Sequence, residues 1–261
     1  MRPKNQPTSI NMREMRIKIL EASHVSKEGH IPSALSILDL LYCIYLEFPA
    51  TTDLELGKDF DFILSKGHAS LALYAVLEEA KIIDNSWVKS FAQFDSDFGG
   101  HPDMRKLLSV SASTGSLGHG FPQSVGKILA NRILGKQKRI FCLVGDGEMN
   151  EGSIWESLLL ASHHQMNELT LLVDINHSTD RALNLGDLDS KLKAFGFETL
   201  AVDGHDHEQI MSALRSDSRK PTAILAKTIK GFGIEMMENN PAWHHLSPSG
   251  EELIEMISVL K

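Results

Sequence analysis

The second half of the chain alternates short apolar runs with segments of helical spacing, and this alternation limits the possible folds most strongly. The apolar runs RIFCLVGD, LTLLVDIN, ETLAVDG and TAILAKT occupy residues 139–146, 169–176, 198–204 and 222–228. The helical segments between them occupy residues 153–165, 188–197 and 207–217. Strands without a polar face are typical of parallel sheets covered by helices on both sides. The pattern therefore predicts an α/β fold, with a doubly wound, mostly parallel sheet and helices on both faces.

The first half adds helices and one more strand to this plan. DFILSKGH, at residues 61–68, indicates a short buried strand that runs into a loop. Helical patterns occupy residues 12–28, 36–48, 70–80, 120–134 and 247–260. The residues between Trp87 and Gly115 show no regular pattern, and an irregular segment of this length is often functional. No internal repeat or Gly/Ser-rich linker interrupts the chain, so we expect residues 1–261 to form a single domain.

Composition argues against several classes of protein. The formal net charge of −8 disfavours binding to nucleic acid or to an anionic membrane. Cys43 and Cys142 lie in apolar runs and form no CxxC pair, so neither a disulfide framework nor a zinc site is expected. The N-terminus lacks the apolar region of a signal peptide, and no uncharged stretch is long enough to span a membrane. We expect a cytoplasmic protein.

Polar residues follow two of the expected strands at their carboxyl ends, where open parallel sheets bind ligands. Asp146 ends one strand and Asn176 ends the next. If these strands are neighbours, the two side chains present oxygen ligands on one edge of the sheet, which suits Mg²⁺ that bridges to phosphate. Gly145 and Gly147 would let the backbone approach a phosphate closely. The helix expected to begin near Ser153 points its N–H groups toward the same edge.

A turn without a ligand is the alternative interpretation of GDG, because Asp and Gly both favour turns and short motifs often occur by chance. Asn is also common at the ends of strands. The spacing and shared strand-end position of Asp146 and Asn176 favour the metal site over the turn.

The sequence GDGEMNEGSIWE, followed by VDIN, resembles the motif of thiamine diphosphate enzymes. Its E-G-x-x-W-E part resembles transketolases more than 2-oxoacid dehydrogenases. Other segments resemble transketolases in the same order along the chain: KEGHIPSALS, LSKGHAS, GGHPD, STGSLGHG and MENNPAWHH. The resemblance extends from Gly29 to His244, and it implies the diphosphate-binding domain of the thiamine-diphosphate-binding fold.

Carried over to matching positions, the resemblance implies a cofactor site. The ligands of Mg²⁺, or of Ca²⁺ in its place, would be Asp146, Asn176 and the backbone carbonyl of Ser178. The residues expected near thiamine diphosphate are Gly147 and His68 at its diphosphate, Gly115 and Leu117 at its aminopyrimidine, and Gly145.

The resemblance also implies residues that face the substrate and a second subunit. His30, His101 and His244 would face the reacting sugar or sugar phosphate, because histidine can donate to or accept from hydroxyls near neutral pH. The cofactor itself would stabilise the carbanion, so the main role of the protein would be to position and polarise the substrate. Glu151 and Glu156 would lie at the subunit interface, where carboxylates link the two cofactor sites.

Three features depart from the usual transketolase pattern. His245 follows His244 where a glycine is expected, and GHG stands where GQG is frequent. The segment after Asn176, at residues 177–196, is shorter than usual. These departures leave the sugar substrate open, including whether it is phosphorylated.

A complete transketolase is far longer than this chain, which ends after the diphosphate-binding domain. The resemblance therefore implies the N-terminal subunit of a split transketolase. Its partner would be a C-terminal transketolase subunit with the pyrimidine-binding domain and the glutamate that activates the cofactor. We expect the two subunits to form a heterotetramer.

The leading hypothesis is a transferase subunit that moves a two-carbon ketol unit from a ketose to an aldose. One alternative is the diphosphate-binding subunit of a 2-oxoacid dehydrogenase or of a synthase that joins pyruvate to an aldehyde. The histidines of the KGH and GGHPD loops favour a polyhydroxylated ketose. A second alternative is a non-catalytic interaction subunit, which the presence of Asp146, Gly147 and Asn176 together disfavours.

Overall fold

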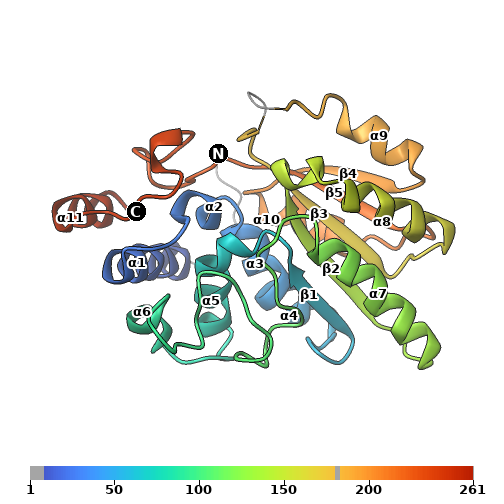
Figure 1. The fold of residues 1–261 in the computed structure, drawn as a ribbon, viewed down its shortest axis with the longest axis horizontal. Helices are drawn as coiled ribbons and strands as arrows, with labels where there is room; N and C mark the ends of the chain where they lie inside the picture. The colour runs from blue at the N-terminus through green and yellow to red at the C-terminus, as the bar shows by residue number, and fades with distance from the viewer. Residues whose placement is uncertain (1–8, 180–182, 261) are drawn as a thin grey trace.

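Five parallel strands form the sheet, in the order β1-β2-β3-β5-β4 (Figure 1). The structure is a computed structural model that describes residues 9–179 and 183–260. The strands are β1 (Phe60–Leu64), β2 (Arg139–Gly145), β3 (Leu169–Ile175), β4 (Glu198–Asp203) and β5 (Thr222–Lys227). They form at the apolar runs of the sequence, so the predicted doubly wound α/β fold is confirmed, with every strand pair parallel.

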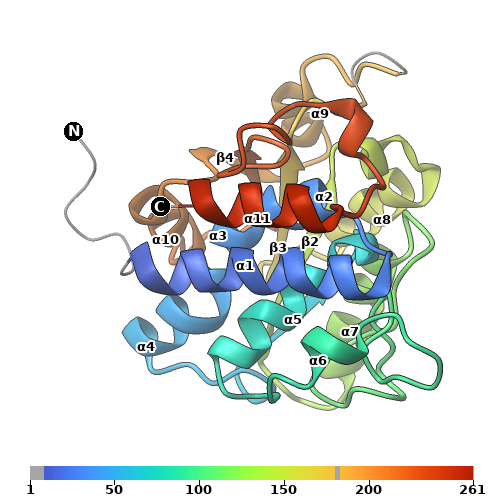
Figure 2. The same ribbon diagram turned by 90° about the vertical axis from the view of Figure 1, so that its left-hand side faces the viewer.

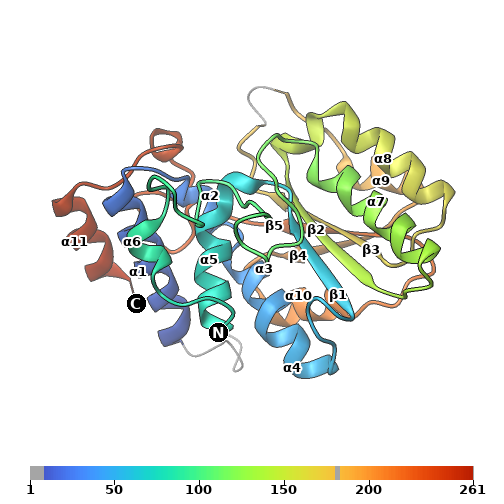
Figure 3. The same cartoon turned by 60° about the horizontal axis from the view of Figure 1, so that its bottom comes forward.

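One face of the sheet is covered by α7 (Gly120–Ile133), α8 (Gly152–His163) and α9 (Leu188–Ala194), as Figure 3 shows. Alternate strand residues, among them Ile63, Cys142 and Leu171, pack beneath these helices in one buried cluster. A strand places successive side chains on opposite faces. The residues between them therefore face a second cluster on the other side of the sheet.

The second cluster joins the sheet to the helices on its other face. Phe62, Leu143 and Ile224 of the strands belong to it. The helices on this side are α1 (Ser9–Ser26), α2 (Ile31–Leu35), α3 (Leu38–Tyr42), α4 (Phe48–Thr52), α5 (Ser70–Glu79), α10 (His207–Leu214) and α11 (Gly250–Val259). Helices α1 and α11 lie side by side as an outer layer (Figure 2).

Residues 36–48 are helical, as expected, but they do not form one regular α-helix. A π-helical turn, Cys43–Glu47, separates α3 from α4, and Phe48 N–H donates to the carbonyl of Cys43, five residues earlier. Pro49 follows at the start of α4. Proline has no N–H and its ring collides with the carbonyl four residues before it, so the regular ladder of hydrogen bonds cannot continue through this position.

The expected irregular segment between Trp87 and Gly115 is confirmed, apart from one short helix, α6 (Trp87–Ser90). The expected C-terminal helix is confirmed, and Ser249 and Glu252 form a reciprocal capping box at the start of α11. None of the helices within the described residues is long and apolar enough to cross a membrane.

Phe141 offers a test of the core on this side of the sheet. It is fully buried in β2, and its ring meets the rings of Phe48 and Phe60 edge to face at 5.3 and 5.6 Å between centroids. We expect Phe141→Ala to lower the free energy of unfolding by about 3–5 kcal/mol in denaturant titrations. Ile133→Ala, at a side chain that is 85% exposed, is the control and should have little effect. Equal stabilities of the two variants would contradict this packing.

Candidate functional site

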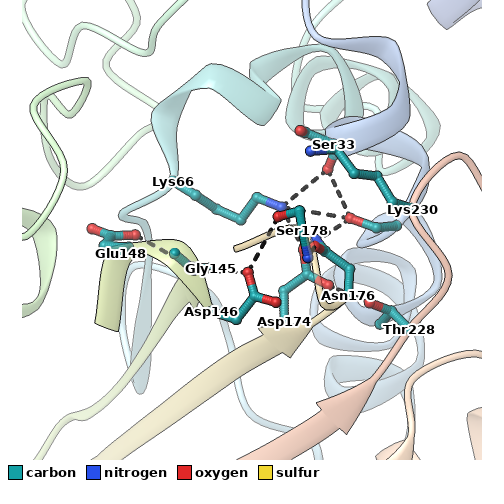
Figure 4. Close-up of polar contacts among 12 residues, drawn as sticks. Ser33, Lys66, Gly145, Asp146, Glu148, Asp174, Asn176, Ser178, Thr228 and Lys230 are labelled. Carbon is teal, nitrogen blue, oxygen red and sulfur yellow. Dashed lines mark hydrogen bonds and ion pairs between the residues drawn. The ribbon is translucent and has the colours of Figure 1, made fainter. Parts of the chain in front are cut away.

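The carboxyl ends of β2 and β3 bring the two predicted metal ligands together. The strands are neighbours, and Gly145 pairs with Asp174 in their register. Asp146 and Asn176 follow on the same edge of the sheet, as the sequence predicted (Figure 4). Ser178 lies beside them, with its hydroxyl 3.3 Å from Asp146 Oδ1.

Asp146 has a buried carboxylate oxygen that no donor of the described residues satisfies. Its side chain is 3% exposed, and Oδ1 accepts from Gly147 N–H at 2.7 Å. Oδ2 is buried and has no hydrogen-bond partner among the described residues. Burial, and then the neighbouring charge of Asp174, raise the pKa of Asp146. An unpaired buried carboxylate is costly, so this oxygen fits a cation that would compensate its charge.

Asn176 is oriented by its neighbours. Its Nδ2 donates to Asp174 Oδ2 at 2.8 Å, and its Oδ1 accepts from Ser178 N–H at 3.1 Å. A flip of the Asn176 amide group would break both hydrogen bonds, so its carbonyl oxygen is fixed on the side of Ser178. Asp146, Asn176 and Ser178 together provide hard oxygen donors of the kind that Mg²⁺ and Ca²⁺ prefer.

Beneath these ligands lies a buried ion pair. Lys66 Nζ is 2.5 Å from Asp174 Oδ2, and both side chains are almost completely buried. Asp174 also accepts hydrogen bonds from the hydroxyls of Ser36 and Thr228. Burial alone would raise the pKa of Asp174, but the charge and hydrogen bond of Lys66 outweigh it and lower the pKa. The lysine therefore neutralises Asp174, and the charge of Asp146 is left for another cation.

Glu148 holds the loops around the site together. It is 1% exposed, accepts from Gly118 N–H at 2.9 Å, and also accepts from the Ser65 hydroxyl. Gly118 has a φ of +79°, and a Cβ at this position would lie 2.6 Å from the Cβ of Glu151. Only glycine fits there. Burial raises the pKa of Glu148.

A cavity of about 330 Å³ opens above the ion pair and the expected metal ligands. It is lined by His30, Ser33, Lys66, His68, Gly115, Leu117, Gly145, Asp146, Gly147, Glu148, Asn176, Ser178, Lys230 and His244. Of the predicted site residues, only His101 and Glu151 are missing from this lining. His101 is exposed, and its ring lies against Gly115, where a Cβ would be 3.2 Å from His101 Cγ. Glu151 is exposed at the start of α8.

Histidine rings gather at one side of the cavity. The ring of His30 lies 5.1 Å from that of His68, 5.4 Å from that of His244 and 4.5 Å from that of His245, between centroids. Nδ1 of His30 is 3.1 Å from the carbonyl oxygen of His244. Burial, the first cause in both cases, lowers the pKa of His30 to about 4 and of His68 to about 2. His30 and His68 therefore present neutral imidazoles at neutral pH.

The sequence interpretation missed four lining residues: Ser33, Lys66, Glu148 and Lys230. Lys66 and Ser33 stand inside the quoted LSKGHAS and KEGHIPSALS segments, and Glu148 directly follows GDG. A lysine between an apolar strand and GH was the available signal. Lys230 lies in a stretch that carried no motif, and only the fold brings it to the site.

Within the segment at 177–196, residues 180–182 lie outside the described residues. The described part includes Thr179, whose Cβ would lie 3.6 Å from a Cβ placed on Gly147. The segment thus borders the cavity at Gly147.

A family model for the thiamine diphosphate binding domain of transketolase matches residues 8–259. The chain belongs to the transketolase family. The recognition made from the motifs is confirmed, and the match covers nearly the whole sequence. It also makes the cavity described above the place to seek thiamine diphosphate.

Curated relatives of two lengths match the chain. The A subunit of apulose-4-phosphate transketolase from Actinobacillus succinogenes is 35% identical over 243 residues, which is 89% of this chain and 88% of that protein. The protein of the same name from Phocaeicola vulgatus is 30% identical over 93% of this chain and 89% of its own length. Human transketolase is 33% identical, but the match covers only 38% of it. The chain thus matches the two bacterial proteins over nearly their whole length, as a transferase subunit of the transketolase family.

Solved structures agree with this fold. Transketolase from Campylobacter jejuni superposes with a TM-score of 0.84 and 28% identity, over 97% of this chain and 43% of that one. The chain therefore spans less than half the length of this transketolase.

The histidine wall gives a pH prediction. The folded pKa values of His30 and His68 lie below the ordinary 6.5, so we expect both rings to stay neutral at pH 6 in ¹⁵N NMR titrations of the native chain. The urea-unfolded chain, in which they protonate normally, is the reference. Because both pKa values are lowered by folding, the stability that the two neutral rings contribute is present above pH 6.5. For His30 it is lost as the pH falls through about 4. Titration of His30 near 6.5 in the native chain would contradict the buried environment.

Proposed function

We propose that this chain is the cofactor-binding subunit of a two-subunit transketolase-like enzyme that uses thiamine diphosphate and Mg²⁺. The observation that carries the proposal is the unpaired, buried Oδ2 of Asp146 at the sheet edge shared with Asn176. In this proposal, residues 1–261 form one cofactor-binding domain, and the protein works in the cytoplasm.

In the proposed site, Asp146, Asn176 and the carbonyl of Ser178 hold the metal. Ca²⁺ could replace Mg²⁺ with the same oxygen donors. Lys230 lines the cavity, and its Nζ lies 3.1 Å from Nδ1 of His244, a ring without negative charge. Its cation is therefore available to the negatively charged diphosphate.

Other residues of the cavity would bind the organic parts of the cofactor. His68 and the backbone at Gly145 and Gly147 face the diphosphate in the proposal. Gly115 and Leu117 lie against the aminopyrimidine. When bound, the cofactor supplies the electron sink that stabilises the carbanion, and the residues of the chain hold and orient it.

For the substrate we propose a ketose donor and an aldose acceptor, either of which can be phosphorylated. His30 and His244 lie at the cavity, with His101 at its edge, and support this assignment. Neutral imidazoles can both donate to and accept from hydroxyl groups, as a polyhydroxylated substrate requires. The two relatives of matching length are named for apulose-4-phosphate, which makes this sugar phosphate a specific candidate.

A partner subunit completes the site in this proposal. The relatives of matching length are named as subunits, which supports a separate chain with the pyrimidine-binding domain. Helix α8 exposes Leu159 by 60% and Leu160 by 42%, one turn after the exposed Glu156. Exposed leucines beside Glu151 and Glu156 fit a covered surface in a heterotetramer.

Reconstitution tests the function. The chain should be purified alone and together with a C-terminal transketolase subunit that carries the pyrimidine-binding domain, and assayed for ketol transfer from a ketose to an aldose. We expect activity only in the mixture, with thiamine diphosphate and Mg²⁺ present. Full activity of this chain alone would contradict the split enzyme, and a preference for pyruvate as donor would favour the 2-oxoacid alternative.

Asp146→Ala tests the metal assignment. Asp146 lies after a strand and not in the apolar core, so we expect the variant to fold with an unchanged circular dichroism spectrum. Mg²⁺-dependent binding of thiamine diphosphate to the reconstituted complex should be lost in calorimetry. Asp217→Ala, at an exposed aspartate remote from the cavity, is the control and should bind normally. Unchanged cofactor affinity in Asp146→Ala would refute the role.

A further inference from the structure

The segment after β5 carries a cation into the cavity. Lys230 lines the cavity beside Asp146, and the residues before it are anchored separately. The Thr228 hydroxyl donates to Asp174, in the buried ion pair described above. The next residue, Ile229, makes its own backbone hydrogen bond to a side chain outside the cavity. Lys230 is also held directly: its carbonyl accepts from Asn239 N–H at 2.8 Å, and its Nζ lies 3.1 Å from His244 Nδ1. The two anchors before it fix the course of the backbone that leads to Lys230.

The side chain that binds Ile229 is His205, in the loop between β4 and α10. Ile229 N–H donates to His205 Nε2 at 2.9 Å. A backbone amide can only donate, so Nε2 carries no proton and Nδ1 carries one. Nδ1–H donates to Asp39 Oδ2 at 3.0 Å, and the ring stacks on Phe232 with 3.6 Å between centroids. The position and the tautomer of the ring are both fixed.

Asp39 keeps the proton on Nδ1. Its side chain is buried, and its second oxygen, Oδ1, lies 3.1 Å from Nε2 of His207. Burial alone would raise the pKa of Asp39, but the hydrogen bonds from His205 and His207 outweigh it and lower the pKa to about 2. An ionised carboxylate only accepts hydrogen bonds, so it requires a donor at His205 Nδ1.

His207 supports Asp39 as a fixed positive charge. Its Nδ1 is 2.9 Å from Glu47 Oε1, so each ring nitrogen faces a carboxylate. Burial would lower the pKa of His207, but the bond to Asp39 and those to Cys43 and Glu47 raise it to about 12. Cys43, Glu47 and His207 are close enough to hold a metal ion. The protonated ring already meets both carboxylates, so the cluster is explained by ion pairs.

We infer that His205 is a positioning residue for Lys230: its Nε2 fixes the backbone at Ile229, and Asp39 fixes the tautomer that allows this. The inference rests on the proposed function, in which Lys230 faces the diphosphate of the cofactor. A series of hydrogen bonds that runs from Glu47 through His207 and Asp39 to His205 then connects helices on one face of the sheet to the cofactor cavity.

Loss of the acceptor at position 205 should release the segment. The N–H of Ile229 would lose its partner, and a hollow of about 540 Å³, lined by Thr228, Ile229 and Phe232 among others, lies beside it. The peptide can turn toward water in this hollow, and Lys230 would then spend less time in the cavity.

Two variants separate the two hydrogen bonds of His205. In His205→Gln the side-chain oxygen reaches the place of Nε2 and can accept from Ile229, whereas the donor to Asp39 is lost. In His205→Asn the side-chain amide nitrogen takes the place of Nδ1 and can donate to Asp39, whereas the acceptor for Ile229 is lost. Leu214→Ala, at a fully buried residue at the far end of α10, is the control for general destabilisation.

Cofactor binding by the reconstituted complex is the first readout. We expect His205→Asn to raise the dissociation constant of thiamine diphosphate about five- to tenfold, the loss that one net hydrogen bond represents. His205→Gln should stay within about twofold of wild type on the same reasoning. Leu214→Ala should bind as wild type does, even where it melts at a lower temperature. Equally weakened binding of thiamine diphosphate in all three variants, or unchanged binding in His205→Asn, would overturn the inference.

Amide exchange of the full-length chain alone is the second readout. Hydrogen exchange at Ile229 should accelerate in His205→Asn and remain slow in His205→Gln and Leu214→Ala. This arm needs neither the partner nor the cofactor. A wild-type complex that fails to bind thiamine diphosphate would refute the proposed function, whereas unchanged exchange at Ile229 in His205→Asn would refute the anchor itself.

Discussion

The buried ion pair between Lys66 and Asp174 is the interaction on which the site depends. Lys66 follows β1 and Asp174 belongs to β3, with β2 between them in the sheet. The hydroxyls of Ser36 and Thr228 also bind Asp174, so this one carboxylate joins the end of α2 and the segment after β5 to the sheet. Removal of one member of such a pair leaves an unpaired buried charge and typically costs about 3–5 kcal/mol.

The same pair sets the electrostatics of the cavity. Two aspartates stand close together at this edge, and one lysine neutralises only one of them. Asp174 is the one that is neutralised, because it is fully buried and accepts from Lys66 as well as from the hydroxyls of Ser36 and Thr228. Asp146 is left with an oxygen that has no partner among the described residues, which is the condition for a metal site. Asp174, on β3, is thus paired with Lys66 and supports the fold, whereas Asp146, directly after β2, is left to bind the proposed metal.

The strands of the sheet and two of the expected metal ligands could be predicted from the sequence for physical reasons. Parallel strands that are covered on both faces consist of nearly continuous apolar residues, so β2, β3 and β5 could be predicted from the sequence. Asp146 and Asn176 could be placed together because the carboxyl ends of parallel strands meet at one edge. The role of Glu148 could not be predicted, because its burial follows from contacts with Ser65 and Gly118, far away along the chain.

What could not be predicted depends on long-range packing. Lys230 reaches the cavity only because β5 lies beside β3, an order that local patterns do not reveal. The contacts of His205 and His207 with Asp39 join parts of the chain more than 160 residues apart in sequence, as the separations of 166 and 168 show.

The central claim is that this chain holds the metal and diphosphate half of a site shared with another subunit. A crystal structure of the reconstituted complex, grown with thiamine diphosphate and Mn²⁺ in place of Mg²⁺, tests it most directly. We predict an anomalous scattering peak bound by Asp146, Asn176 and the carbonyl of Ser178, with the aminopyrimidine covered by the partner. A metal peak elsewhere, or a cofactor enclosed by this chain alone, would contradict the account.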